Sequence, residues 1–461
     1  MEKDFDVVII GAGMSGLAAG IRLAMFDQKV CILESHSIPG GLNSYYQRGK
    51  RKFDVGLHAM TNWTPKGTKG KPLSKIMKQL RIPYDEFQLV PQKQSSIRFP
   101  NHKLTFTNNI QDLLDEVQCH FPNEIDGLIN LITYIEGYND TDLTSIYSSA
   151  KDVVSTFIKD KILLNMIFCP LMIYGSAWEH DMDFSQFAIM FKSIFLEGFS
   201  RPTGGVRTII DLLSKKLKQQ GLLVQYKSQV QQLHKVDNKI SAITLKNGDR
   251  IRCRKILSSA GYRETLNLFE EKLKEDKKVI IGKMSFTESI LILDKKPCEY
   301  GIEDTIIFTN DSHEYNYRNP NTLFDTTSSV LCFPNNFIKD EEDEGIFRAT
   351  MMADYDCWNK LEKDQYKQEK LNVLESSKAL FLKHSGSEIK DLLFSDVFTP
   401  TTVKKYTKHE NGCVYGSPTK TRDGTTSVEG LYLMGTDQGF LGIIGAMLSG
   451  ISMANYHCLR N

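Results

Sequence analysis

Three glycines near the start of the 461-residue sequence, Gly11, Gly13 and Gly16, have the spacing G-x-G-x-x-G. In a nucleotide-binding turn, the first glycine permits a tight bend, the second lets the backbone approach a pyrophosphate, and the third allows a helix to pack closely on a strand. Glu34 follows at a distance where a carboxylate accepts hydrogen bonds from a ribose diol. These residue types and their spacing indicate a site that binds a dinucleotide.

The segments around these glycines have the periodicity that such a site requires. Residues 5–10 form a β-branched, apolar run typical of a buried parallel strand, and apolar residues recur at helical spacing after the turn. A second apolar run, KVCILE, ends at Glu34. This order favours a nucleotide site over a glycine-rich bend that binds nothing. The residues that we expect to contact the cofactor here are Gly11, Gly13, Met14, Ser15, Gly16, Glu34 and Ser35.

A second glycine pair, Gly40-Gly41, precedes an apparent hairpin that ends in FDVGLHAM, residues 53–60. With these motifs the chain resembles the flavoprotein superfamily of amine oxidases, phytoene desaturases, carotenoid isomerases and retinol saturases. The resemblance implies a bound FAD, with the glycine-pair loop against its phosphate and ring portions and the D-x-G element near its ring. Amine oxidases usually have arginine after the pair, so Leu42 moves the resemblance toward the carotenoid and retinol enzymes. The residues implied are Gly40, Gly41, Leu42, Asn43, Gly56 and Leu57.

Residues 201–261 resemble the segment that returns the chain to the FAD domain in this superfamily. Gly204-Gly205 opens an amphipathic helix, residues 222–236 alternate as a strand should, and a hairpin turns at Asn247-Gly248. The resemblance implies that the backbone amide of Val230 contacts adenine and that Gly261 ends the last strand of this block.

The C-terminal stretch contains a second nucleotide-type turn. A strand over residues 431–434 runs into Gly435 and Asp437, and a helix begins near residues 442–445. The resemblance implies that Gly435 belongs to the cofactor site and that Asp437 bonds the ribityl or phosphate portion of the flavin. The start of the helix then points at the pyrimidine end of the ring, where its dipole stabilises negative charge. The alternative is a buried helix with small residues for close packing. The helix residues implied are Gly442, Ile443 and Ile444.

These motifs predict an α/β fold with a discontinuous, Rossmann-like FAD-binding domain of the GR2 type. We expect this domain to comprise residues 1–60, 201–262 and 416–461. A mixed α+β substrate domain, residues 61–200 and 263–415, is then inserted twice. Its aromatic-rich apolar helices either line a tunnel for substrate or form ordinary core.

Composition narrows the setting of the protein. A formal net charge of +1 gives no field that favours nucleic acid. Nine scattered cysteines without a C-x-x-C pair argue against a disulfide framework or a structural zinc site and favour a reducing compartment. The apolar stretch 162–177 is interrupted by Asn165 and Pro170 and is too short to span a bilayer. We therefore expect a cytoplasmic protein with no metal site, for which peripheral contact with a membrane surface stays open.

The implied chemistry is carried by the flavin, so the protein has to orient the substrate bond and exclude water. The resemblance predicts an oxidoreductase that desaturates, saturates or isomerises carbon–carbon bonds of a hydrophobic, polyene or isoprenoid-like substrate. Its electron acceptor or donor is oxygen, a quinone or a reductase. His58 is the candidate for proton transfer to or from a polyene carbon, and the alternative is a hydrogen-bonded histidine without that role.

Two other functions stay open on sequence alone. One is a flavin amine oxidase for a small amine. The other is a lipid carrier similar to the prenyl-Rab dissociation inhibitors, although Glu34 and Asp437 argue against it because a carrier has no need of groups for the flavin. Cys413 lies near the position where some amine oxidases attach flavin covalently, but its surroundings do not match, and we expect FAD to be bound non-covalently.

Overall fold

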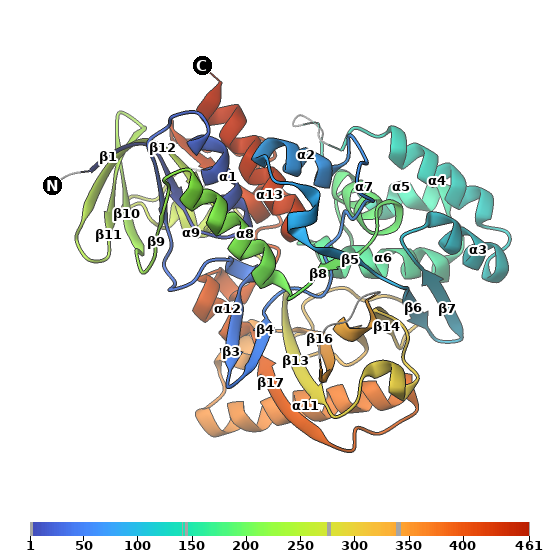
Figure 1. Ribbon diagram of the computed structural model, residues 1–461. Coiled ribbons are helices and arrows are strands. Elements are labelled where there is room, and N and C mark those ends of the chain that lie inside the picture. The colour runs from blue at the N-terminus through green and yellow to red at the C-terminus, as the bar shows by residue number, and fades with distance from the viewer. Residues whose placement is uncertain (1–2, 141, 143–145, 274–277, 338–342, 461) are drawn as a thin grey trace.

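The computed structural model describes residues 3–140, 142, 146–273, 278–337 and 343–460, and this part of the chain contains two seven-stranded sheets (Figure 1). In the first sheet the order is β10-β11-β12-β1-β2-β9, and β18 also pairs with β12. Strands β1, β2, β9, β12 and β18 pair in parallel, whereas β10, β11 and β12 pair antiparallel. The bounds are β1 Lys3–Ile10, β2 Val30–Leu33, β9 Val224–Gln225, β10 Val230–Val236, β11 Lys239–Leu245, β12 Arg250–Ser258 and β18 Leu431–Leu433.

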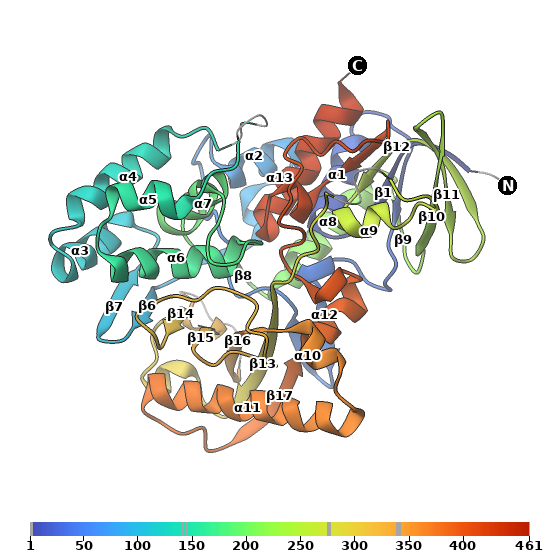
Figure 2. The same cartoon turned by 180° about the vertical axis from the view of Figure 1, so that it is seen from behind.

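Strand β1 is buried on both faces because its side chains alternate between two apolar cores. Val7 and Ile9 face a core shared with helices, while Val8 and Ile10 face β10, β11 and β12. The helices of the first core lie side by side beside the sheet in both views (Figures 1 and 2). They are α1 Met14–Ala24, α2 Pro72–Leu80, α8 Val206–Gln219 and α13 Gly442–Met453, which continues as a π-helical turn Ala454–Leu459.

Helices α1 and α13 come from opposite ends of the chain and pack with almost no space between their backbones. A Cβ atom on Gly450 would lie 2.0 Å from the carbonyl oxygen of Ser15, and one on Gly16 would lie 2.0 Å from that of Gly11. Only glycine fits at such an approach. Small residues at these positions therefore fix the two helices against each other and against the first turn.

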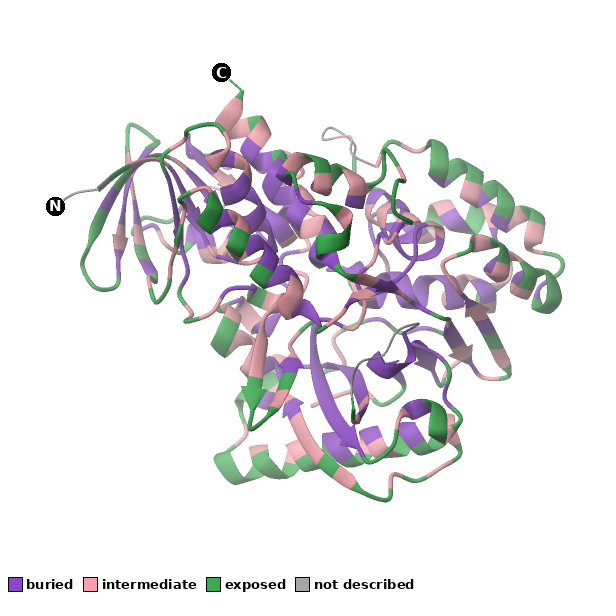
Figure 3. Ribbon diagram, viewed as in Figure 1, coloured by how far each residue is buried: buried purple, intermediate pink, exposed green. Residues whose placement is uncertain are grey.

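The second sheet has the strand order β17-β13-β16-β15-β14-β6-β7. One of its faces packs on the long helix α11, Lys363–Ser385, and the other packs on a group of shorter helices. All nine residues of β13 are buried, as expected of a central strand (Figure 3). The bounds are β6 Ser95–Phe99, β7 His102–Phe106, β13 Ser285–Leu293, β14 Ile306–Asn310, β15 Ser328–Cys332, β16 Gly345–Ala353 and β17 Leu392–Phe398.

The shorter helices form a separate layer beside the second sheet (Figure 1). Aromatic rings fill their contacts, as between Phe168 of α6 and Phe187 of α7, whose centroids lie 4.9 Å apart. Helix α7 passes directly into a π-helical turn, Lys192–Leu196. The bounds are α3 Ile110–His120, α4 Ile125–Gly137, α5 Ala150–Phe157, α6 Lys161–Gly175 and α7 Phe184–Phe191.

Small elements join these parts of the molecule. The hairpin of β3 and β4 lies against the second sheet, where Phe53 stacks on Phe394 at a centroid distance of 5.3 Å. Strands β5 and β8 pair with each other between the two sheets. The bounds are β3 Tyr45–Arg48, β4 Arg51–Asp54, β5 Leu89–Pro91, β8 Ser200–Pro202, α9 Tyr262–Leu266, α10 Tyr355–Asn359 and α12 Pro400–Thr407.

The alternating stretch at residues 222–236 is not one strand. It forms β9 and β10, which lie at opposite ends of the first sheet. Lys227 has a left-handed backbone with φ of +54°, and the N–H of Ser228 donates to the carbonyl oxygen of Glu34 at 2.8 Å. At this turn the chain leaves β9 and passes the carboxyl ends of β2 and β1 before it forms β10. The alternation of apolar and polar residues does not reveal such a path.

Helix α2 lies in the segment 61–200, which the sequence analysis assigns to the substrate domain. Its Leu73, Ile76 and Leu80 join the core of α1 and α13 rather than the core of the second sheet. No helix in the described part of the chain is both long and apolar enough to cross a bilayer. The nine cysteines, all within the described residues, form no disulfide bonds.

Candidate active site

A cavity of about 960 Å³ begins at the carboxyl ends of β1, β2 and β12 and reaches the second sheet and the helical layer. Its lining at one end consists of glycine turns and backbone. At the other end it includes side chains of β13, β15 and β16, together with residues of α6 and α7. A single space therefore connects elements from both sheets.

The two predicted glycine turns, at residues 11–16 and 40–41, lie against each other in this cavity. The N–H of Gly40 donates to the carbonyl oxygen of Ala12 at 2.9 Å, and Gly13 pairs with Gly40 in a parallel bridge. A Cβ atom on Gly41 would lie 3.4 Å from the Cα atom of Gly13. The turns thus form one wall made mostly of backbone, which lets a ligand approach closely.

Glu34 is buried at this wall, with 8% of its surface exposed. One carboxylate oxygen accepts the N–H of Ala12 at 2.8 Å, and the other accepts the N–H of His36 at 2.7 Å. These bonds fix the carboxylate as it lines the cavity, so that its remaining lone pairs are preorganised to accept hydroxyl donors.

Two helices begin at the cavity without a side-chain cap. Neither Gly13 before α1 nor Leu441 before α13 makes a side-chain capping bond, and the first residues of both helices line the cavity. The first N–H groups of a helix need partners, and they carry partial positive charge. Both ends therefore suit a ligand with anionic or acceptor groups, such as a pyrophosphate.

Most of the predicted contact residues line the cavity, but some do not. Those in the lining are Gly11, Gly13, Met14, Ser15, Glu34, Ser35, Gly40, Gly41, Leu42, Asn43, Gly56, His58, Val230, Gly435, Gly442 and Ile443. Those outside it are Gly16, Leu57, Gly261, Asp437 and Ile444.

Packing places Gly16, Leu57, Ile444 and Gly261 behind the wall of the cavity, and their contacts with the cofactor stay predictions. Leu57 and Ile444 are each 1% exposed and belong to the core of α1 and α13. Gly16 packs on the first turn, as described above. A Cβ atom on Gly261 would lie 2.2 Å from a carboxylate oxygen of Glu264, so Gly261 leaves room for that side chain.

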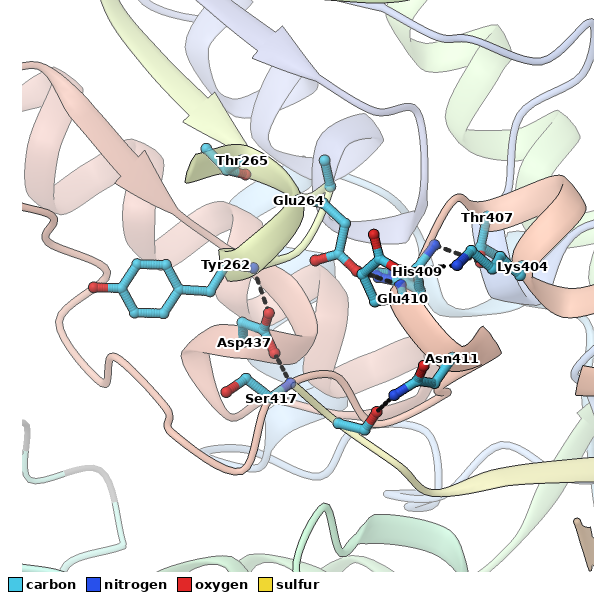
Figure 4. A network of polar contacts seen from close by, with 12 residues as sticks. Tyr262, Glu264, Thr265, Lys404, Thr407, His409, Glu410, Asn411, Ser417 and Asp437 are labelled. Atoms are coloured by element: carbon cyan, nitrogen blue, oxygen red, sulfur yellow. Dashed lines mark hydrogen bonds and ion pairs between the residues drawn. The ribbon is translucent and has the colours of Figure 1, made fainter. Parts of the chain in front are cut away.

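Asp437 also lies outside the lining, because its carboxylate accepts hydrogen bonds from the protein itself (Figure 4), and its contact with the flavin stays a prediction. It accepts the backbone N–H of Tyr262 at 2.5 Å and that of Ser417 at 2.7 Å, and Lys420 lies 3.5 Å away. Its neighbour Thr436 lines the cavity instead. Asp437 thus ties the C-terminal turn to the segments that flank it.

A buried histidine–carboxylate pair, which the sequence motifs did not identify, lies beside this turn (Figure 4). His409 Nδ1 lies 3.4 Å from Glu264, and both residues line the cavity. Burial alone would lower the pKa of His409, but Glu264 raises it. Burial alone would raise the pKa of Glu264, but His409 and the N–H of Glu410 hold it low. Each partner therefore favours the charged form of the other.

His58 belongs to a second buried cluster, formed with Glu288 of β13 and with Thr350 and Arg348 of β16. Its Nε2 lies 3.3 Å from Glu288 and 3.1 Å from the hydroxyl of Thr350. Arg348 bonds Glu288 at 2.5 Å. Burial alone would raise the pKa of Glu288, but Arg348 and His58 hold it below its usual range, so the carboxylate is ionised.

Arg348 also holds the loop that carries His58. Its two terminal nitrogens donate to the carbonyl oxygens of Val55 and Leu57, both at 2.6 Å. The side chain of Arg348 is 3% exposed, and Glu288 compensates its buried charge. The second sheet therefore sets the position of a loop that belongs in sequence to the first glycine motifs.

Tyr174 forms an aromatic wall next to His58. Their rings are stacked with centroids 6.2 Å apart, and Tyr174 also contacts Phe199 and Phe308. The hydroxyl of Tyr174 is buried and has no hydrogen-bond partner in the described part of the chain. A donor or acceptor in the cavity would satisfy it.

Comparison with known proteins places these features in a family. The model of the family described as flavin containing amine oxidoreductase matches residues 14–456. The chain belongs to this family. Its fold is thus the predicted α/β fold of FAD-dependent oxidoreductases, and the protein is an oxidoreductase whose cofactor is FAD.

Individual relatives of this flavin amine oxidoreductase are distant but extend over nearly the whole chain. It is 24% identical to prolycopene isomerase of Daucus carota over 98% of this chain and 80% of the relative. It is 23% identical to all-trans-retinol 13,14-reductase of Danio rerio over 100% of this chain and 87% of the relative. An oxidoreductase structure from Methanosarcina mazei has a TM-score of 0.67 at 15% identity and covers 98% of this chain and 100% of its own. These relatives confirm the carotenoid and retinol branch, and neither alternative function is favoured.

The residues of the cavity fit FAD. Backbone at Gly13 and Gly41 leaves space for the pyrophosphate, Glu34 presents acceptors for a ribose, and the uncapped starts of α1 and α13 suit the anionic groups.

We predict a pH dependence of stability from the pair His409–Glu264. The raised pKa of His409 contributes stability that is complete below its ordinary value of 6.5 and is lost as pH rises through the raised value. The lowered pKa of Glu264 contributes stability that is complete above 4.5 and is lost as pH falls through the lowered value. The pair therefore stabilises most between these limits.

Thermal unfolding of the FAD-saturated protein from pH 6 to pH 9 measures this effect. The wild-type melting temperature should fall more steeply than that of His409→Gln, and the exposed-site control His313→Gln should follow the wild type. Parallel curves for wild type and His409→Gln would contradict the assignment.

Proposed function

We propose that this flavin oxidoreductase acts on carbon–carbon bonds of a hydrophobic polyene or isoprenoid-like substrate, by desaturation, saturation or isomerisation. The observation that carries the proposal is the single cavity, which joins the FAD-binding wall to an apolar region beside His58. Side chains of this region come from the helical layer and the second sheet. They are Ile173, Ile189, Met190, Leu196, Phe286 and Val330.

The character of this region supports a hydrocarbon-rich substrate. Apolar and aromatic walls favour burial of apolar surface, and they also exclude the water that would compete with transfer of electrons or protons. The names of the two relatives, a prolycopene isomerase and a retinol reductase, belong to enzymes of polyene molecules and support the same substrate class.

The bound flavin supplies hydride or electron transfer. The chain contributes a proton at His58, for which the cluster around this residue is arranged. Because Glu288 and Thr350 engage Nε2, the other ring nitrogen, Nδ1, is the atom that exchanges a proton with a substrate carbon. The carboxylate of Glu288 orients the ring of His58 from 3.3 Å, and Arg348 holds both that carboxylate and the loop of His58 in place.

We propose that FAD is bound without a covalent link. Cys413, the cysteine nearest in pattern to an attachment site, is 3% exposed and does not line the cavity. Burial raises the pKa of its thiol to about 12, which opposes formation of the reactive thiolate. The electron acceptor or donor is oxygen, a quinone or a small reductase.

We also propose the domain division predicted from sequence, with one adjustment. The first sheet draws its strands from segments 1–60, 201–262 and 416–461, and the second sheet draws its strands from segments 61–200 and 263–415. Helix α2 belongs with the FAD-binding domain because its apolar side packs on α13. The remainder of the inserted segments forms the substrate domain.

Anaerobic mixing tests the function. Oxidised and reduced forms of the flavin-loaded protein are mixed with all-trans-retinol, a carotene and putrescine, while flavin absorbance and product mass are recorded. We expect polyenes to change the flavin spectrum or to appear as desaturated, saturated or isomerised products, and putrescine to do neither. Bleaching by putrescine alone would instead indicate an amine oxidase.

The role of His58 gives a separate prediction. His58→Gln should keep its flavin spectrum and lose about 100-fold or more in turnover, since a positioned acid or base contributes 10²–10⁴-fold. His313→Gln, at an exposed position, should retain wild-type turnover. Unchanged turnover in His58→Gln would reduce this histidine to a structural role.

We further propose peripheral contact with a membrane, from which an apolar substrate would enter. Ile146 is 87% exposed and Tyr134 is 45% exposed, and both lie close in sequence to Glu136 and Asp140 at the cavity. Co-sedimentation with phosphatidylcholine–phosphatidylserine vesicles measures the contact. Wild type and the control Leu223→Ser, which changes an exposed aliphatic residue elsewhere, should sediment, and Ile146→Ser should sediment less. Absence of wild-type sedimentation would end this proposal.

A further inference from the structure

A buried carboxylate and a buried amide line the cavity, where apolar side chains of α7 meet the charged groups of Lys71, Asp140 and Lys192. Glu197 is 5% exposed and Asn62 is 8% exposed, and both line the cavity near Met190 and Leu196. The amide nitrogen of Asn62 donates to Glu197 Oε2 at 2.9 Å. Polar groups of this kind are costly in an apolar wall unless they are hydrogen-bonded.

The backbone holds both residues in unusual conformations. Asn62 has a left-handed φ of +64°, and its N–H donates to the carbonyl oxygen of Ser193 at 2.9 Å. Glu197 follows the π-helical turn Lys192–Leu196, and its N–H donates to Lys192 at 2.9 Å. Left-handed non-glycine residues and π-helical turns both cluster at functional sites, where they aim a side chain.

The carboxylate of Glu197 has acceptor capacity that the protein does not fill. Two carboxylate oxygens offer about four lone-pair sites. Within the described ranges, Glu197 accepts the one hydrogen bond from Asn62, and Lys71 lies 3.7 Å from its other oxygen, beyond hydrogen-bonding distance. The free acceptor sites therefore suit a hydrogen-bond donor on a molecule in the cavity.

The charges around this pair select the kind of donor. Lys71 pairs with Glu197, and Lys192 pairs with Asp140 at 2.8 Å, so both carboxylates already face a cation. A substrate ammonium would add an unbalanced positive charge to this partly buried group, whereas a hydroxyl adds none. Burial raises the pKa of Glu197, because the site disfavours negative charge. An anionic group on the substrate would therefore be disfavoured there as well.

We infer that Glu197 and Asn62 form a subsite for a neutral hydroxyl group, and that the substrate is a polyene or isoprenoid alcohol. The inference rests on the proposed function. In this arrangement the hydroxyl donates to Glu197 and the hydrocarbon chain lies along the apolar wall. A pure hydrocarbon would leave the carboxylate without a donor.

The subsite would also choose the bond that reacts. Asn62 and His58 lie on the same loop, and Arg201 donates to the carbonyl oxygens of Leu57 and His58 at 3.2 and 3.4 Å. A Cβ atom on Gly442 would lie 3.9 Å from the hydroxyl of Thr61, which places this loop against the start of α13. A hydroxyl anchored at one end of the loop fixes which carbon faces His58 at the other.

Binding of three matched probes tests the inference. All-trans-retinol, retinyl methyl ether and retinylamine are titrated into the flavin-loaded protein, and the dissociation constants are taken from the change in flavin absorbance. The wild type should bind retinol about 10-fold or more tightly than the ether, the range for one hydrogen bond to a charged group. It should also bind retinol more tightly than the amine.

Variants assign the preference to the carboxylate. Glu197→Gln should bind the alcohol and the ether within about 3-fold of each other, while Glu136→Gln, at an exposed carboxylate lining the same cavity, should keep the wild-type preference. Lys71→Gln should gain affinity for retinylamine because it removes the balancing cation. This last variant also tests the subsite if Glu197→Gln loses its flavin.

Each opposite outcome overturns the inference. Equal wild-type binding of alcohol and ether, or an unchanged preference in Glu197→Gln, would exclude a hydroxyl subsite at Glu197. If the protein still converts the probes, the proposed function stands without the subsite. Tighter wild-type binding of the amine would assign the pair to an ammonium instead. If no probe alters the flavin spectrum and none is converted, the proposed function and the inference both fail.

Discussion

Direct contact between backbones from distant parts of the chain is the constraint on which the rest of this structure depends. Gly40 bonds to Ala12 and pairs with Gly13, and Gly450 lies where any side chain would collide with Ser15. Gly40 and Gly450 leave no room for a Cβ atom, which would lie 2.8 Å from the Cα atom of Ser44 and 2.0 Å from the carbonyl oxygen of Ser15. These contacts bring two helix starts without side-chain caps and two turns to one wall, and this wall can bind FAD through its backbone N–H groups.

The second sheet completes the site through a buried charge pair. Arg348 and Glu288 lie on neighbouring strands of this sheet. Arg348 donates hydrogen bonds to two carbonyl oxygens of the loop that carries His58, so the sheet holds this loop in a fixed position. Removing either partner would leave an uncompensated buried charge, which costs about 3–5 kcal/mol. The same pair thus joins the FAD-binding part to the substrate part and fixes the charge around the histidine.

Two buried carboxylates, Glu288 and Glu197, line the cavity beside its apolar side chains, and each has a strong effect on what binds. His58 lies beside Glu288, and Glu197 lies beside Asn62, with apolar side chains of α6 and α7 lining the cavity around them. An apolar chain gains from burial along such walls, while a buried carboxylate strongly prefers a hydrogen-bond donor. Substrate orientation follows from these two tendencies acting together.

The sequence by itself determined the family, the cofactor and the wall formed by the two glycine turns, because these depend on local patterns of glycine, apolar runs and one acid. It also placed His58 at the cavity through a short motif. Only the tertiary structure decided that Thr436 rather than Asp437 faces the cavity, and that Glu288, Glu197 and the pair His409–Glu264 line it. It also decided that Arg348 holds the loop of His58. The physical reason is that the residues in contact are far apart in the sequence, as Leu57 and Arg348 are. No local spacing of residues can therefore predict these contacts. Their roles arise from burial and charge pairing, which exist only after the chain has folded.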